Sequence, residues 1–284
     1  MGNEADKARR ASDPSLTLGE QFSNVDSAAD ASPFVTYLDR VAERARDFKR
    51  AGYNLLELKP GDAVLDVGCG PGTDVFGLEA IVGAQGRAVG VDASAAMIDE
   101  ARRRAAETGS RAEFMLSPGE SLPFPDGTFD AVRTERVLMH VADAARAVRE
   151  LARVSKPGGR VLTIEPDHQM SSIDAADGEL GDALFRGLHA SVRSPRIGRQ
   201  LRALFLRAGL TEVDLRVVAH VITSWADFKA LTGFVEGLPE TAVAKGLASE
   251  AQVRSLLADL EARDAEGCFF GCFVFMRCKG VRPR

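Results

Sequence analysis

A glycine-rich loop is the stretch of this chain with the clearest chemical purpose. It has the sequence Asp66-Val67-Gly68-Cys69-Gly70-Pro71-Gly72, and it stands between a short apolar run and a helical pattern. Glycine permits a tight turn and lets the backbone approach a ligand with no Cβ in the way. Backbone N–H groups exposed at the start of a helix suit a carboxylate or a phosphate. The loop therefore predicts a site for a cofactor-sized ligand.

An acidic residue, Asp92, ends the next apolar run. A carboxylate at this place can accept hydrogen bonds from both hydroxyls of a ribose. The dinucleotide fingerprint G-x-G-x-x-G requires a glycine three positions after Gly70, where this chain has Thr73. The loop and the acid indicate a ribose-bearing cofactor, but by themselves they do not decide which one.

Histidines are the candidate proton acceptors, because only histidine has an unperturbed pKa near neutral pH. His140 follows the apolar run 129–134, which is predicted to be a strand, and Glu165, Asp167 and His168 lie at and just after the end of the predicted strand 160–165. Substrates in parallel α/β sheets bind beyond the carboxyl ends of the strands. We predict His140, Glu165 and His168 as catalytic candidates, with His140 as a general base and an acid such as Glu165 orienting it. A purely capping role is the alternative for each.

Aromatic side chains outside the sheet motifs are candidates for a substrate pocket, although core packing is the alternative for each. These candidates are Phe34, Tyr37, Phe185, Trp225, Phe228 and Phe234. His189 is predicted to lie in a lid, and His220 to be structural within a strand. The phenylalanines of the last apolar run are predicted to be buried in a strand and not to line a pocket; they are Phe269, Phe270, Phe273 and Phe275.

Composition limits the class of protein. The 284 residues carry a net charge of −5, which argues against a phosphate-backbone binder, so we expect no nucleic-acid partner. No signal-like or membrane-spanning run is visible, which predicts a cytoplasmic protein without a membrane partner. The four cysteines do not form a metal motif, so they are predicted to be buried thiols and no metal is expected. A monomer and a homodimer are both left open.

Alternating strands and helices must position these residues. Strands are predicted at 63–67, 88–91, 112–116, 129–134 and 160–165, with helices at 73–81, 94–108 and 143–155 between them. This alternation predicts βαβ units and a parallel sheet covered on both faces, the doubly wound α/β architecture. Further strands are predicted at 210–222 and 268–278, and none between 168 and 193.

The chain divides by pattern into an arm and one domain. Residues 1–32 are polar and aperiodic, which predicts a flexible N-terminal arm that could order over a ligand. Residues 33–284 are predicted to be one domain that begins with a helix. Its segment 60–166 is the cofactor-binding half, and 167–284 is the substrate-side half with helical lid insertions.

The ordered motifs of the first half resemble those of class I S-adenosylmethionine-dependent methyltransferases. They are VLDVGCGPGTD (64–74), VGVDAS (89–94), SLPFPDGTFD (121–130), VLMHVAD (137–143) and RVSKPGGRVLTIEP (153–166). The combination is most similar to the small-molecule methyltransferases, including those of ubiquinone and menaquinone biosynthesis. The resemblance implies a Rossmann-like, seven-stranded, mostly parallel sheet and S-adenosylmethionine as cofactor.

The resemblance also implies roles for individual residues. Asp66, Gly68, Cys69 and Gly70 would surround the methionine part of the cofactor, with Glu135 and Arg136 beside its backbone and sulfonium. Asp92 would bind the ribose. Ala93 and Met97 would pack near the adenine, and Gly119 and Glu120 would lie at its edge. Tyr37, from the first helix, is assigned to the cofactor-binding set as well as to the pocket candidates.

One position departs from the family pattern. Related sequences often carry an aspartate that accepts a hydrogen bond from the adenine amino group, and this chain has Pro118 there. The backbone of Gly119 or the carboxylate of Glu120 would have to replace it, unless Glu120 is an ordinary loop acid.

The predicted function is transfer of a methyl group to a small molecule of secondary or quinone metabolism. The predicted acceptor atom is an oxygen or a nitrogen, and carbon is the less favoured alternative. The alternatives are an RNA or protein methyltransferase and a methyltransferase-like protein that binds the cofactor without transferring the methyl group. A nicotinamide dehydrogenase is a further alternative.

Overall fold

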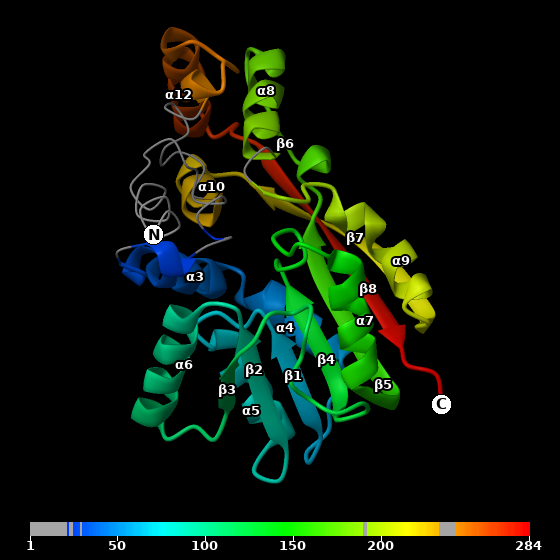
Figure 1. Ribbon diagram of the computed structural model, residues 1–284. Coiled ribbons are helices and arrows are strands. Elements are labelled where there is room, and N and C mark those ends of the chain that lie inside the picture. The colour runs from blue at the N-terminus through cyan, green and yellow to red at the C-terminus, as the bar shows by residue number, and fades with distance from the viewer. Residues whose placement is uncertain (1–21, 23–24, 29, 190–191, 233–241) are drawn as a thin grey trace, which may run out of the picture.

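The computed structural model of the chain describes residues 22, 25–28, 30–189, 192–232 and 242–284. Five parallel strands form the first part of its sheet, in the spatial order β3-β2-β1-β4-β5. Their bounds are Ala63–Val67 for β1, Arg87–Asp92 for β2, Glu113–Leu116 for β3, Phe129–Glu135 for β4 and Ser155–Pro166 for β5. The predicted doubly wound α/β fold is confirmed (Figure 1).

Three more strands complete the sheet, and only β8 among them runs antiparallel to β5. The last strand, β8 (Gly271–Val281), pairs with β5 along one side and with β7 (Thr211–Ile222) along the other. The two-residue strand β6 (Ser172–Ile173) pairs with the start of β8 on the side of β5. Eight strands thus occupy seven positions, and β6 corrects the prediction of no strand between 168 and 193.

The start of β5 also differs from the prediction. Phe129 pairs with Ser155, but Ala131 pairs with Arg160, so the residues between form an irregularity in the strand and not a loop before it. Gly158 lies there with a φ of 79°, and its N–H donates to the carbonyl of Arg282. A left-handed glycine and a partner from the C-terminal segment keep this bulge within the sheet.

Helices cover both faces of the sheet, and each layer closes its own hydrophobic core. The helices α4, α5 and α6 pack on one face, and α7 and α9 pack on the other. Their bounds are Arg46–Leu55 for α4, Thr73–Val82 for α5, Ala95–Thr108 for α6, Ala144–Val154 for α7 and Ile197–Arg207 for α9. Adjacent residues of a strand alternate between the two cores: Val64 belongs to one and Leu65 to the other.

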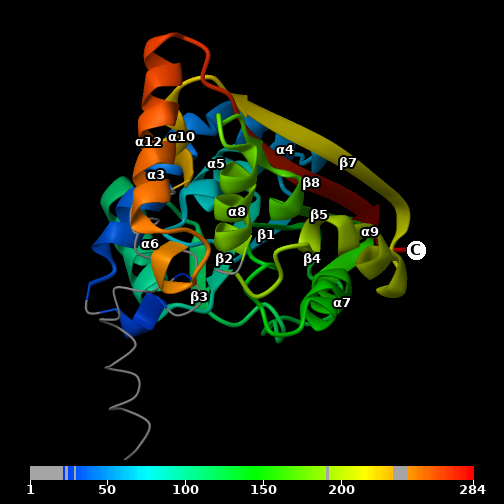
Figure 2. The same cartoon turned by 90° about the horizontal axis from the view of Figure 1, so that it is seen from above.

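A helical cap lies beyond one end of the sheet. It consists of α8 (Gly178–His189), α10 (Trp225–Thr232) and α12 (Glu250–Ala265), which share a third hydrophobic core. Figure 1 shows these helices gathered at one end of the molecule, with α3 (Ser32–Arg44) next to α10; Figure 2 gives the view from above. None of the helices within the described ranges has the length and apolarity that a membrane span requires.

Part of the predicted flexible arm is bound to the domain. The 3-10 helix η1 (Val25–Ser27) brings Asp26 to the N-terminus of α6, where its carboxylate accepts the N–H groups of Ala95 at 2.8 Å and Ala96 at 3.2 Å. Val25 packs with Phe34 and Met97. A carboxylate is favourable at a helix N-terminus because it meets unpaired donors and the positive end of the dipole. These contacts attach residues 25–28 of the predicted arm to α6 and to the cavity wall.

Candidate active site

A cavity of about 540 Å³ lies at the carboxyl ends of the parallel strands. The glycine loop after β1, the segment after β2 and the segment after β4 all line it, together with α3, α4 and the ends of β7 and β8. This volume is typical of sites that enclose a small molecule and its cofactor. Of the fifteen residues predicted for the site, all but Asp66 and Glu165 line this cavity.

The glycine loop is shaped by its neighbours. Gly68, Gly70 and Gly72 have φ values of 75°, 51° and 86°, which only glycine adopts without strain. The N–H groups of Gly68 and Cys69 both donate to the carbonyl of Val91, which fixes the loop against the end of β2. A Cβ on Gly68 would collide with the side chain of Val137, so glycine is needed here for close approach of the segment after β4.

Asp92 is placed between the loop and the next helix. One carboxylate oxygen accepts the N–H of Gly70 at 2.9 Å, and the other accepts the N–H of Ser94 at 2.9 Å. Burial raises the pKa of Asp92 above its usual range, and the two backbone N–H groups oppose that shift. A carboxylate has about four lone-pair positions, so each oxygen keeps capacity toward the cavity. Both oxygens can therefore hold the loop and a pair of hydroxyl groups.

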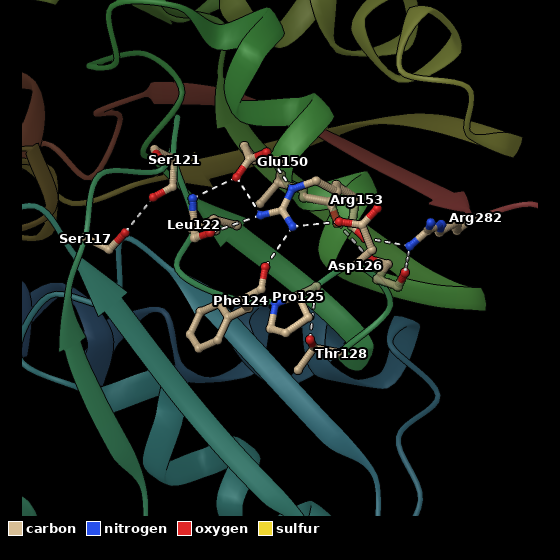
Figure 3. Close-up of polar contacts among 12 residues, drawn as sticks. Ser117, Ser121, Leu122, Phe124, Pro125, Asp126, Thr128, Glu150, Arg153 and Arg282 are labelled. Carbon is tan, nitrogen blue, oxygen red and sulfur yellow. Dashed lines mark hydrogen bonds and ion pairs between the residues drawn. The ribbon is translucent and has the colours of Figure 1, made fainter.

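The loop between β3 and β4, which contains Gly119 and Glu120, is held by one arginine of α7 (Figure 3). The guanidinium of Arg153 donates to the carbonyls of Leu122 at 3.0 Å and Phe124 at 2.7 Å and forms ion pairs with Asp126 and Glu150. Glu150 in turn accepts the N–H of Leu122 at 2.8 Å. This clamp holds the chain just after Gly119 and Glu120.

Replacing Arg153 by alanine is expected to lower the free energy of unfolding by about 1–3 kcal/mol, because the partners of its guanidinium lose a charged donor. Hydrogen exchange should rise within residues 117–128. The matched control is Arg103→Ala on α6, whose own side chain is 55% exposed, so that the loss of its ion pairs with Glu100 and Glu107 should cost less than about 1 kcal/mol. If urea unfolding gave the same loss of unfolding free energy for both substitutions, Arg153 would not stabilise this loop.

Glu120 forms hydrogen bonds to the backbone just before α7, a contact that the sequence did not predict. Its carboxylate accepts the N–H of Ala142 at 2.9 Å and that of Asp143 at 3.5 Å, although the residue also lines the cavity. Neither of the two predicted roles, a free loop acid or an adenine acceptor, includes this contact. Glu120 joins the loop after β3 to the N-terminus of α7.

A buried charge network lies behind the glycine loop. Arg133 has a side chain that is 1% exposed, and its Nη atoms lie 3.3 Å from Asp66, 3.2 Å from Asp74 and 2.5 Å from Glu135. Lys49 completes it, with its Nζ 2.7 Å from Asp74 and 3.0 Å from Glu135. Asp66 is thus committed to Arg133 and does not line the cavity, which corrects its predicted contact with the cofactor.

The positive charges of the network favour the ionised form of Asp74. Burial opposes ionisation, but Arg133 and Lys49 hold the pKa of Asp74 well below its usual range. Tyr53 adds a hydrogen bond from its hydroxyl to the same carboxylate. Lys49 also lines the cavity, and sequence reasoning missed it because nothing in the pattern of α4 separates it from an ordinary surface lysine.

Arg136 and Tyr37 meet across the cavity. Arg136 follows β4 with a φ of 60°, an uncommon conformation for a residue with a side chain, and its N–H donates to the carbonyl of Ile164 at 2.9 Å. Its guanidinium donates to the hydroxyl of Tyr37 at 3.1 Å and lies over the Tyr37 ring. The hydroxyl of Tyr37 donates to the carbonyl of Leu231 at 3.1 Å, which links α3 to α10.

The predicted acid–base residues have different surroundings. His140 lines the cavity, and burial together with the charge of Arg136 lowers the pKa of His140 to about 4. Glu165 is fully buried, and its carboxylate accepts the N–H groups of Val137 at 2.9 Å, Leu138 at 2.8 Å and Met139 at 3.3 Å. The idea that Glu165 contacts substrate or orients the imidazole of His140 is therefore corrected: its oxygens hold the backbone of residues 137–139.

Asp167 and His168, which follow Pro166, also have different surroundings. Asp167 is fully buried and forms a two-bond ion pair with Arg199 of α9, at 2.5 and 2.6 Å, so its role is to anchor that helix. His168 lines the cavity, as predicted for a residue that follows β5.

Several pocket predictions are corrected by the fold. His220, Phe273 and Phe275 line the cavity, because the inner ends of β7 and β8 reach it. Trp225 and Phe228 lie in the hydrophobic core of the cap, and Phe34 packs in a small core with Val25 and Met97. The side chains of Phe185, His189 and Phe234 lie outside the described parts. Two of the four cysteines, Cys69 and Cys278, are buried, whereas Cys268 is exposed.

The arm contributes residues that the sequence analysis did not place in the site. Phe22, Val25 and Asp26 line the cavity, and the ring of Phe22 lies 5.0 Å from that of Phe34 and 5.6 Å from that of Tyr37. The sequence gives no signal that separates Phe22 and Val25 from the other apolar residues of this mostly polar segment, such as Leu16 and Leu18.

Comparison with known proteins agrees with this geometry. A family described as "Methyltransferase domain" matches residues 64–159. An uncharacterized 37.1 kDa protein in transposon TN4556 of Streptomyces fradiae is 44% identical over 178 residues, which cover 62% of this chain and 51% of that protein. This chain therefore spans about half the length of that relative.

In two further matches, the aligned region covers a larger share of the other protein. A 2-phytyl-1,4-naphtoquinone methyltransferase of Synechococcus elongatus is 32% identical over 180 residues, which cover 58% of this chain and 77% of that protein. The crystal structure of a putative methyltransferase from Bacillus halodurans matches with a TM-score of 0.59 and 16% identity, over 83% of this chain and 99% of that chain. The second match is a likeness of fold.

Proposed function

This chain belongs to the class I S-adenosylmethionine-dependent methyltransferases, and from that membership we propose that it transfers a methyl group from S-adenosylmethionine to a small molecule. The observation that carries the proposal is the cavity of about 540 Å³, which extends from the glycine loop over β4 to the ends of β7 and β8. One side of it suits a cofactor and the other side suits a second molecule.

The residues on the side of β1, β2 and β3 fit the cofactor. We assign the ribose hydroxyls to Asp92, whose two oxygens keep capacity toward the cavity. Met97 and the loop at Gly119 would enclose the adenine, and Gly68 to Gly70 would face the methionine part. When bound, S-adenosylmethionine supplies an electrophilic methyl group on a sulfonium, which an acceptor atom attacks in line.

The residues on the side of β5, β7 and β8 would hold the acceptor. Ile222, Leu231, Phe273 and Phe275 line this side, which favours a flat apolar molecule. The naphthoquinone ring in the name of the Synechococcus relative has that character, so a quinol or a similar aromatic compound is the proposed acceptor class. The methylated atom is proposed to be oxygen or nitrogen, with carbon as the alternative.

His140 is proposed to accept a hydrogen bond from the acceptor. Because its pKa is lowered to about 4, its imidazole is neutral throughout the physiological range and is a weak base. Because the pKa of His140 is lowered, its imidazole gains a proton only in acid. Between about pH 5.5 and 8 the rate should therefore follow ionisation of the acceptor and not that of His140.

The test uses purified protein, isotopically labelled S-adenosylmethionine and a panel of reduced 1,4-naphthoquinone, 1-naphthol and 1-naphthylamine. Mass spectrometry should find a labelled methyl product, and His140→Asn should reduce the rate while leaving the shape of its pH profile unchanged. Cofactor binding by calorimetry with no product from any compound would favour a non-methylating role. No binding of the cofactor would overturn the proposal.

A further inference from the structure

We propose that Arg136, held in place by Tyr37, binds an anionic oxygen of the methyl acceptor, so that the enzyme selects acceptors that carry a carboxylate or an ionised phenol. This inference rests on the proposed function and specifies the substrate class of the same site.

The first argument is the distribution of charge around the cavity. Five acids line the cavity among the described residues, and all of them lie in the arm or in segments at the ends of β1 to β4: Asp26, Asp74, Asp92, Glu120 and Glu135. On the acceptor side, the lining residues contributed by β7, β8, α10 and the segment after β5 include histidines and apolar residues but, among those that the structure describes, no carboxylate. An amine acceptor would meet no counter-charge there, whereas an anion would meet Arg136.

The second argument is that the nearby carboxylates are already committed. Glu135 pairs with Lys49 at 3.0 Å and with Arg133 at 2.5 Å. Glu165 accepts three backbone N–H groups. Within the described ranges no carboxylate lies at ion-pair distance from Arg136, and its guanidinium donates to the hydroxyl of Tyr37 at 3.1 Å. A half-buried guanidinium has five donors, so this one retains donors for an anion in the cavity.

The third argument is preorganisation. The backbone of Arg136 is fixed by its N–H bond to Ile164, and the guanidinium is fixed by the ring and hydroxyl of Tyr37. The hydroxyl of Tyr37 is itself held by the carbonyl of Leu231 in α10. A guanidinium held before binding loses little conformational entropy when it meets a carboxylate or a phenolate.

The experiment measures probe binding to the protein loaded with S-adenosylhomocysteine. The first pair of probes is 2-naphthoate and 2-naphthamide, which differ in charge but hardly in shape. The second is 4-nitrophenol below and above its own pKa. We expect the anionic form of at least one pair to bind about tenfold more tightly than the neutral form, a difference of about 1.4 kcal/mol. The pair that shows the preference identifies the carboxylate or the phenolate as the anion recognised.

Three variants separate anion binding from a structural role. Arg136→Gln should reduce the preference to about onefold, and Arg136→Lys should retain part of it because the charge remains. Arg207→Gln, on the exposed side of α9, is the matched control and should keep the full preference. Binding of S-adenosylhomocysteine should stay within about threefold in Arg207→Gln, whereas its loss in Arg136→Gln would assign the guanidinium to the cofactor and overturn the inference.

The outcomes are distinct. Equal binding of charged and neutral forms by the wild type, equal loss of both in Arg136→Gln, or no saturable binding of any anionic probe would each overturn the inference while cofactor binding persists. Failure of the wild type to bind S-adenosylhomocysteine would instead count against the proposed function.

Discussion

Replacing Arg133 by methionine is expected to lower the free energy of unfolding by about 3–5 kcal/mol, the largest effect on stability that the structure predicts. The side chain of Arg133 is 1% exposed and lies among three carboxylates, those of Asp66, Asp74 and Glu135. Without the guanidinium, Lys49 remains as their single positive neighbour among the described residues. A loss of this size is a large fraction of the total stability of a domain, which is about 5–15 kcal/mol.

Urea unfolding followed by circular dichroism checks the result. Arg207→Met on α9 removes an exposed arginine and should change the free energy of unfolding by less than about 0.5 kcal/mol. The double variant Asp66→Asn with Arg133→Met should recover part of the loss, because one of the unpaired carboxylates is then neutral. An unfolding midpoint of the single variant equal to that of the wild type would show that the network contributes nothing.

Replacing Asp92 by asparagine is expected to weaken binding of S-adenosylhomocysteine by about a hundredfold, or about 2.7 kcal/mol. Asparagine presents one oxygen, so either the N–H of Gly70 or that of Ser94 loses its acceptor, and the charge toward the ribose is lost. Titration calorimetry measures the change.

The control for this prediction lies on the adjoining helix. Asp99 of α6 has a side chain that is 77% exposed, and Asp99→Asn should leave the dissociation constant unchanged. Circular dichroism distinguishes lost binding from lost structure. If Asp92→Asn binds S-adenosylhomocysteine within about threefold of the wild type, Asp92 does not hold the cofactor.

The elements of the sheet could be predicted because their signals are local. Apolar runs ending in glycine or aspartate identified β1 and β2, and Ser94 and Asp143 were correctly predicted as N-caps of α6 and α7. Contacts between distant segments could not be predicted in this way. Asp66 and Arg133 are unremarkable one at a time, and their pairing depends on the parallel register of β1 with β4.

The residues on the acceptor side of the cavity could not be predicted from local patterns either. His220, Phe273 and Phe275 lie in strands whose pattern is that of ordinary core, and only the antiparallel pairing of β7 with β8 brings them to the cavity. The sequence makes Trp225 and Phe228 pocket candidates as well, but they pack against α12 in the core of the cap. Which aromatic residues face a ligand is decided by the packing of the cap, and a single sequence does not encode that packing in any local pattern.

The contact of Asp26 with α6 has a consequence for the shape of the cavity. The carboxylate that closes the N-terminus of α6 belongs to a segment that also lines the cavity, next to Met97. A movement of this segment away from the cavity would break the hydrogen bonds from Ala95 and Ala96 to Asp26. The shape of the cavity on this side and the capping of α6 are therefore coupled through one carboxylate.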